Sequence, residues 1–205
     1  MRYINEDLFL LDVKDDGIVK CDNDRSISFS TDDYFGFDFT NLAYTKTGVP
    51  SLATTNRGDS IEKEMLEALF NLLNELDQFP VSLIALEDKW VDEECLELDQ
   101  NSAFTPEEKE LLIKIDGSGA SMDVVEFEED ELEDAIRLLY PQLVLRQNRC
   151  AIIGRDGLTL STASYDDEVS FNTLSKELYD RARSIIREQE DSFRFEVVWI
   201  EAPLD

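Results

Sequence analysis

The chain has 205 residues, of which 47 are acidic, 19 are Lys or Arg and none is His, so its formal net charge is −28. A surface this negative repels nucleic acid, anionic phospholipid and anionic metabolites, and it attracts basic proteins and cations. Because 42% of the residues are apolar and 10% are aromatic, the composition excludes a disordered polyanion and predicts a folded body that carries the charge.

The first forty residues predict a β-meander. Its strands are expected at 8–13, 18–21, around 27–29 and at 35–39. The Asp-Asp-Gly run at 15–17 suits a tight turn between the first two strands, because Gly readily adopts positive φ. Phe35, Phe37 and Phe39 alternate with Gly and Asp, which places the three rings on one buried face of the last strand.

A helix is predicted at 60–77 and a buried strand at 81–86. Asp59 is a suitable N-cap and Glu62 stands three residues later, as in a capping box. Apolar side chains then recur at helical spacing until Pro80 ends the pattern. The almost wholly apolar run at 81–86 is typical of a central strand.

Residues 87–134 carry 19 acidic and three basic side chains, which is more than half of the net charge. Within this segment Thr105, Pro106 and Glu108 predict the start of a helix, and a flexible turn follows at 116–119. A further helix is predicted at 128–140 and is expected to end at Pro141. Its acidic residues gather near its N-terminus, where the helix dipole favours them.

The last third predicts strands at 143–145, 149–154, 158–161 and 193–200, and a helix at 173–190. Together these elements predict an α+β fold with mainly antiparallel sheet and about four helices. The sequence is compatible with two lobes, 1–100 and 101–205 with a break near 98–105, and also with a single domain.

The sequence argues against an enzyme. Without His, the usual serine and cysteine triads are excluded and the commonest general base is missing. The run 22–33 places oxygen atoms at the calcium-ligand positions of an EF-hand, but Ile27 stands where that loop needs Gly, so a turn explains the run better. We therefore expect no catalytic residue, no metal site and no cofactor. A metal-dependent enzyme with Asp and Glu ligands is the less favoured alternative.

Cys21, Cys95 and Cys150 are far apart and odd in number, which predicts reduced thiols in a cytoplasmic protein. The N-terminus lacks the charged-then-apolar order of a signal peptide. No apolar stretch approaches the ~20 residues that a membrane span requires, so we expect no membrane association.

The acidic segment 87–134 gives the strongest indication of function. Carboxylates that recur every four residues between 126 and 134 would form rows about 5–6 Å apart on a helix. Each strand of duplex DNA carries a charge every ~3.4 Å, so such a ridge would approximate a line of phosphates. The predicted partner-binding residues are Trp90, as an aromatic anchor, and the carboxylates Glu93, Glu94, Glu126, Glu129, Asp130, Glu133 and Asp134. The alternative for Trp90 is a place in the core.

We therefore expect a non-catalytic inhibitor that binds a basic nucleic-acid-handling protein, such as a nuclease, a restriction or CRISPR effector, or a nuclease toxin. In charge and size the chain resembles anti-defence proteins of phages and plasmids and immunity proteins against nuclease toxins. The alternative is a structural or adaptor domain whose acidity serves only solubility.

The arginines of the last third of the chain carry positive charge that can compensate these carboxylates. They are suited to bidentate carboxylate pairing. We expect them to dock the acidic segment onto the C-terminal region or to form the seam of a homodimer; a phosphate-binding patch is the less favoured alternative in a protein of this net charge. They are Arg137, Arg146, Arg149, Arg155, Arg181, Arg183, Arg187 and Arg194.

Overall fold

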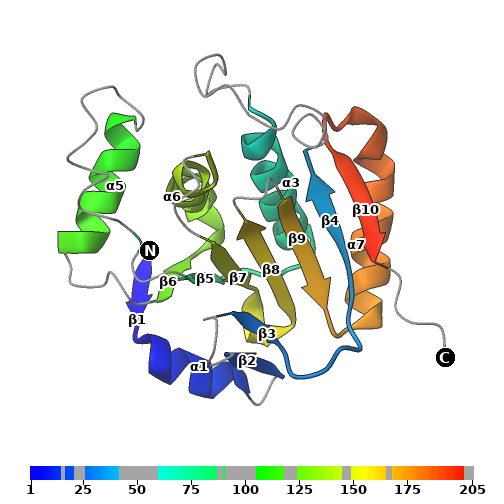
Figure 1. Cartoon of the computed structure of the whole chain (residues 1–205), viewed down its shortest axis with the longest axis horizontal. Coiled ribbons are helices and arrows are strands. Elements are labelled where there is room, and N and C mark those ends of the chain that lie inside the picture. Colours follow the sequence, from blue (N-terminus) through cyan, green and yellow to red (C-terminus); the bar gives the residue numbers. More distant parts are fainter. Residues whose placement is uncertain are drawn as a thin grey trace.

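An eight-stranded sheet forms the centre of the computed structural model (Figure 1). The structure describes residues 1–14, 17–20, 26–41, 60–86, 90, 105–117, 124–144, 149–164 and 168–200. The strands lie in the order β1-β6-β5-β7-β8-β9-β4-β10, and neighbouring strands run antiparallel. Their bounds are β1 Arg2–Ile4, β4 Phe35–Thr40, β5 Val81–Ala85, β6 Val124–Phe127, β7 Cys150–Ile153, β8 Thr159–Ser164, β9 Glu168–Thr173 and β10 Glu196–Ile200. A separate hairpin pairs β2 (Ile18–Lys20) with β3 (Ile27–Phe29).

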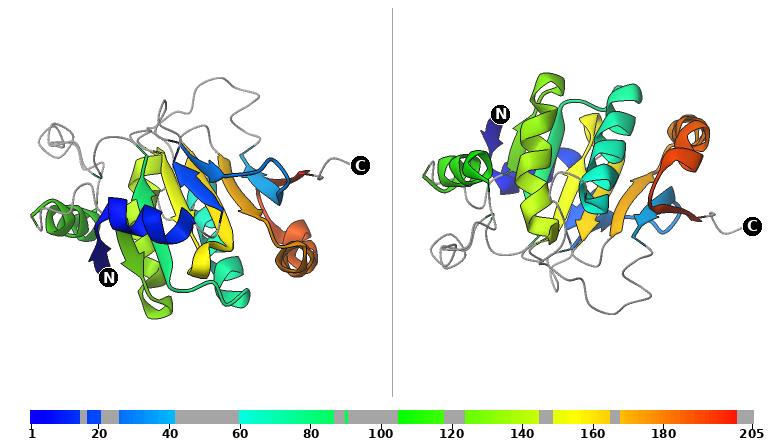
Figure 2. Two further views of the ribbon diagram at one scale, coloured as in Figure 1. Left: turned by 90° about the horizontal axis from the view of Figure 1, so that it is seen from below. Right: turned by 90° about the horizontal axis from the view of Figure 1, so that it is seen from above.

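Helices cover one face of the sheet, and a smaller layer covers part of the other (Figures 1 and 2). The described α-helices are α1 Glu6–Lys14, α3 Ile61–Glu75, α5 Pro106–Gly117, α6 Leu132–Val144 and α7 Lys176–Gln189. The main core lies between the sheet and α3, α6 and α7, and α5 extends this core by packing on α6. A second cluster lies on the opposite face, where Val13 of α1 and Ile18 of β2 pack with Ile84 and Ile153 of the sheet. The predicted α+β class with mainly antiparallel sheet is confirmed.

Strands from the two halves of the chain are interleaved in this sheet. β5 lies between β6 and β7, and β4 lies between β9 and β10. The segments 1–100 and 101–205 therefore share one sheet. Nearly all of the predicted break at 98–105 lies outside the described residues, so that boundary stays a prediction.

The alternating Phe pattern is confirmed at β4. Phe37 and Phe39 are fully buried in the main core, and the Phe37 ring stacks on Phe171 of β9 with 5.1 Å between ring centroids. Phe35 is half-buried and stacks on Tyr179 of α7. The period-two pattern thus turns the β4 rings towards the helical layer, as the sequence predicts.

The two predicted helix starts have different outcomes. At α5 the predicted helix start is confirmed. Thr105 and Glu108 form a capping box there, in which the Glu108 amide donates to the Thr105 hydroxyl (3.2 Å) and the Thr105 amide donates to the Glu108 carboxylate (2.7 Å). At α3 the N-cap is Ser60, whose hydroxyl accepts a hydrogen bond from the Lys63 amide. The predicted capping box of Asp59 and Glu62 is therefore wrong by one residue, and Asp59 itself lies outside the described residues.

The predicted strand at 8–13 is wrong, because these residues belong to α1. The acidic Glu6 and Asp7 in its first turn and Lys14 in its last complement the helix dipole. Gly17 follows with φ +92, and its amide donates to the Lys14 carbonyl (3.1 Å). Gly17 therefore has the positive φ that was predicted, but the element before it is a helix and not the first strand of a hairpin.

The predicted helix end at Pro141 is also wrong. α6 continues to Val144 with Pro141 inside it, so the strand predicted at 143–145 is absent at 143–144. A proline in a helix removes one backbone hydrogen bond. We attribute the continuation to the burial of Leu139, Tyr140 and Leu143 on both sides of the proline.

Candidate partner-binding surface

The acidic residues 126–134 occupy the end of β6, a single 3-10 turn (η2, Glu129–Glu131) and the start of α6. Strand β6 is anchored by three buried side chains, those of Val124, Val125 and Phe127. The inner face of α6 is likewise buried, through Ala135, Leu138 and Leu139. These anchors leave Glu128, Glu129, Asp130 and Glu133 exposed. Exposed carboxylates therefore gather where strand β6 leads into helix α6.

The predicted rows of charge on a single helix are wrong. Glu126 belongs to β6, Glu129 and Asp130 belong to the 3-10 turn, and Glu133 and Asp134 begin α6. Residues four apart in sequence therefore do not share one helical face across this segment. The carboxylates therefore gather where β6, the 3-10 turn and α6 follow one another, and they do not form a ridge along one helix.

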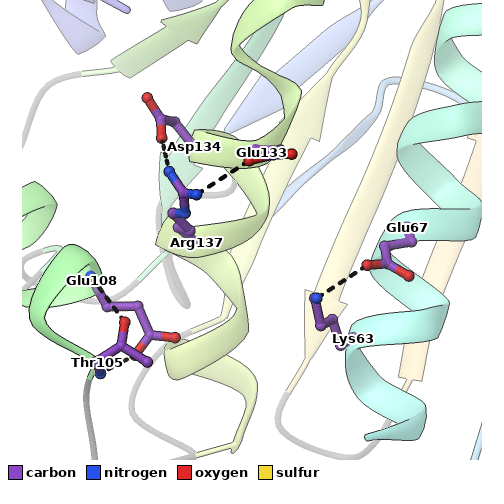
Figure 3. A network of polar contacts seen from close by, with 7 residues as sticks. All are labelled: Lys63, Glu67, Thr105, Glu108, Glu133, Asp134 and Arg137. Carbon is purple, nitrogen blue, oxygen red and sulfur yellow. Dashed lines mark hydrogen bonds and ion pairs between the residues drawn. The ribbon is translucent and has the colours of Figure 1, made fainter. Parts of the chain in front are cut away.

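Part of this charge is compensated by described groups. Arg2 Nε lies 3.1 Å from a Glu126 carboxylate oxygen, and the amino group of Met1 pairs with Glu131, which lowers the pKa of the Glu131 carboxyl chiefly through that hydrogen bond. Arg137 donates to Asp134 (2.9 Å) and to Glu133 (3.1 Å), as Figure 3 shows.

The remainder of the cluster stays negative. Seven carboxylates lie between residues 126 and 134, and the three cationic groups named above contact four of them. Among the described residues, Glu128, Glu129 and Asp130 have no ion-pair partner. The side chain of Glu133 is 82% exposed despite its contact with Arg137. We call Glu128, Glu129, Asp130, Glu133 and Asp134 the η2–α6 cluster.

The position of the η2–α6 cluster also has a structural explanation. Acidic side chains near a helix N-terminus are stabilised by the helix dipole, typically by about 0.3–1 kcal/mol each. Glu128 and Glu131 in addition form a capping box around the 3-10 turn. These effects account for acids in the first turn, but they do not require the 3-10 turn to carry two further exposed carboxylates at 129 and 130.

A pocket of about 320 Å³ lies next to the cluster, between α3, α5 and α6. Arg137 belongs both to the wall of this pocket and to the ion pairs of the η2–α6 cluster. Figure 3 shows that Lys63 of α3 and the Thr105–Glu108 cap of α5 flank the same part of α6. The lining residues are Lys63, Thr105, Glu107, Glu108, Ile136, Arg137 and Tyr140.

The prediction of Trp90 as an exposed anchor is wrong. The Trp90 side chain is only 1% exposed and belongs to the main core, and its backbone carbonyl accepts a hydrogen bond from the Gln142 side chain (2.8 Å). In this structure Trp90 is therefore a core residue, which was the alternative for it. Glu93 and Glu94 lie outside the described residues, so their part in binding stays a prediction.

The described arginines of the last third mostly bond to groups outside the acidic segment. Arg181 donates to the Glu75 carbonyl at the end of α3 (3.1 Å), and the Arg194 amide donates to Glu64 of α3 (3.1 Å). Arg183 and Arg187 lie over the Trp199 ring, with 5.6 and 4.8 Å to its centroid. Arg137 contacts the η2–α6 cluster. The homodimer seam stays a prediction.

A second pair of neighbouring carboxylates lies on strands β4 and β9. Asp38 is opposite Ser170 in the register, and Glu168 is opposite Thr40. Asp38 alternates with the buried Phe37 and Phe39 and therefore lies on the face away from α3 and α6. Burial raises the pKa of Asp38 to about 6, and the negative charge of Glu168 adds to the effect. Among the described residues, no group of three or more Cys, Asp or Glu side chains is placed to hold a metal ion.

The raised pKa of Asp38 predicts a pH-dependent gain from Asp38→Asn. The folded protein holds this proton between pH 4 and pH 6 while the unfolded chain has lost it, so the stabilising contribution of the protonated group disappears as the pH rises through 6. We expect Asp38→Asn to raise the free energy of unfolding at pH 7.5 by about 1–2 kcal/mol, allowing for solvent screening, and to leave it nearly unchanged at pH 4. Urea unfolding at both pH values measures this difference. Asp32→Asn, an exposed site with the same change in charge, is the control; equal gains for both variants would contradict the assignment.

Comparisons with protein-family models, with curated proteins and with solved structures found no match to this chain. No described helix combines the length and the apolar character needed to cross a membrane. The pocket was not predicted from the sequence, because Lys63, Glu107 and Tyr140 are far apart along the chain. The helix start at Thr105 was the one signal that marked part of its wall.

Proposed function

We propose that this protein is a non-catalytic inhibitor that binds a basic protein through the η2–α6 cluster. The observation that supports this proposal is the group of exposed carboxylates at 128–130, which have no ion-pair partner among the described residues and adjoin Glu133 and Asp134. Clustered charge of one sign steers an oppositely charged partner into contact and excludes partners of like charge.

The partner in this proposal is a nucleic-acid-handling protein of the cytoplasm, such as a nuclease, a restriction or CRISPR effector, or a nuclease toxin. Such proteins present basic clefts that neutralise phosphates. A folded acidic body with a net charge of −28 can occupy such a cleft and block it. Because the carboxylates do not form one helical row, the proposal rests on the exposed carboxylates of the η2–α6 cluster and on the field of the whole protein, and it does not require a line of charges spaced like phosphates.

Affinity capture from host lysate across a salt series tests this function. We expect one basic, nucleic-acid-binding protein to be retained at low ionic strength and released as salt screens the contact, and we expect its activity on nucleic acid to be inhibited by the purified chain. Retention of an acidic or neutral partner that is insensitive to salt would contradict the proposal and favour an adaptor domain.

The metal-dependent alternative predicts a different result. A divalent cation that binds the folded state raises the melting temperature by mass action. A rise with calcium, magnesium or manganese that exceeds the effect of matched ionic strength would support that alternative. The described carboxylate pair Asp38 and Glu168 would be the first place to look for its ligands.

A further inference from the structure

The pocket between α3, α5 and α6 has an apolar floor and a charged rim. Ile136 and Tyr140 of α6 are 6% and 5% exposed and supply the floor. Lys63, Glu107 and Arg137 approach from three different helices. A volume of about 320 Å³ is at the lower end of the range for ligand sites. The pocket is therefore suited to one side chain or a small fragment.

The charges around this pocket favour a cation. Lys63 and Arg137 line it, but Lys63 pairs with Glu67 at 3.3 Å, and Arg137 pairs with both Glu133 and Asp134. Glu107 and Glu108 line the pocket as well. Glu108 is buried and bonded in the α5 cap, so the solvent-accessible carboxylates around the pocket are Glu107, Glu67, Glu133 and Asp134, against the two cations Lys63 and Arg137. Because exposed ion pairs are weak, these carboxylates can exchange their present partners for an incoming charge.

We propose that this pocket receives a basic side chain of the bound protein, with arginine as the preferred occupant. This inference rests on the proposed function and adds the chemical identity of the anchoring group. The aliphatic stem of arginine would pack on Ile136 and Tyr140, and its planar guanidinium would meet the carboxylates at the rim. Because Arg137 joins the pocket to the η2–α6 cluster, one anchored side chain would place the neighbouring basic surface on that cluster. Binding energy in interfaces concentrates on such seated residues.

A single-residue probe tests the pocket without any partner protein. N-acetyl-arginine methylamide, titrated into the isotope-labelled full chain, should shift the NMR signals of Glu107, Ile136 and Tyr140 in a saturable manner. Its neutral citrulline counterpart should not. Lys63→Met should strengthen binding and Glu107→Gln should weaken it, each by about five-fold, the effect of one charge about 4 Å away in a watery environment. Both positions are solvent-accessible, and the same spectra show whether each variant is folded.

Three results would overturn this inference. The first is an absence of shifts at the pocket in the wild-type titration. The second is the opposite sign for the two variants, together with binding of N-acetyl-aspartate methylamide, which would make the pocket an anion site. The third is unchanged partner capture by Lys63→Met and Glu107→Gln when charge reversal in the η2–α6 cluster abolishes capture. That pattern would reject the anchor and leave the proposed function standing.

Discussion

Replacing Glu129, Asp130, Glu133 and Asp134 with lysine is expected to lower the affinity for the captured partner by roughly 100-fold or more. Each reversal exchanges an attraction of about 1 kcal/mol at 4 Å in water for a repulsion of similar size, and about 1.4 kcal/mol corresponds to ten-fold in affinity. These four carboxylates include the two in the 3-10 turn that lack ion-pair partners among the described residues. Titration calorimetry with the identified partner measures the change.

A matched control separates local from global charge in this experiment. Asp32, Asp33, Glu177 and Glu188 are exposed and lie away from the cluster, so their replacement by lysine gives the same net charge. We expect this control to weaken binding only slightly. Because lysine at 133 and 134 opposes the helix dipole, the Gln and Asn variants of the cluster are needed as well, and unfolding curves verify that each variant is folded. Equal losses for the cluster and for the control would show that overall acidity, not this cluster, determines binding.

Trp90→Ala is expected to lower the free energy of unfolding by about 3–5 kcal/mol, the usual result of deleting a large buried ring. The side chain is 1% exposed and packs within the main core, so the variant leaves a cavity that the neighbouring residues fill incompletely. Denaturant unfolding monitored by far-UV circular dichroism measures the loss. A typical domain has a free energy of unfolding of only about 5–15 kcal/mol, so the variant would lose a large fraction of its stability.

Trp90→Phe separates packing from recognition at this position. It retains most of the buried volume, so we expect a smaller loss of stability and unchanged affinity for the partner. If Trp90→Ala instead kept wild-type stability and lost the partner, the ring would be a surface anchor and its burial in this structure would be contradicted.

The elements that were predicted correctly have patterns that depend on local chemistry alone. The alternation at β4 and the continuous apolar run at β5 identify strands whatever lies beside them. The Thr105 and Glu108 cap marks the start of α5 because both of its hydrogen bonds are local. In each case residues within a few positions of one another decide the structure.

The errors arose where distant packing decides the structure. The apolar run at 8–13 fits a strand or a helix, and α1 is anchored by the contact of Val13 with the second core cluster. Pro141 is tolerated inside α6 because buried neighbours hold the helix on both sides of it. Local sequence propensity cannot predict such contacts, because they join residues that are far apart in the chain.

The candidate site was predicted in part for the same reason. Composition located the acidic segment, but it could not show that Glu126 belongs to a strand, that Arg137 pairs with two of the carboxylates, or that Trp90 is buried. The pocket beside the cluster requires three helices to meet, so no local pattern predicts it. The useful sequence signal was the excess of charge, and the structure shows that part of it lies in the 3-10 turn and the first turn of α6.

Hydrogen–deuterium exchange of the captured complex tests the central claim most directly. The 3-10 turn and first turn of α6 contain amides without intrahelical partners, so they should exchange quickly in the free protein. We predict strong protection on binding at 128–134 and at the start of α5, with little change at α1 and α7. Protection confined to other surfaces, with 128–134 exchanging as fast as in the free chain, would contradict binding through the η2–α6 cluster.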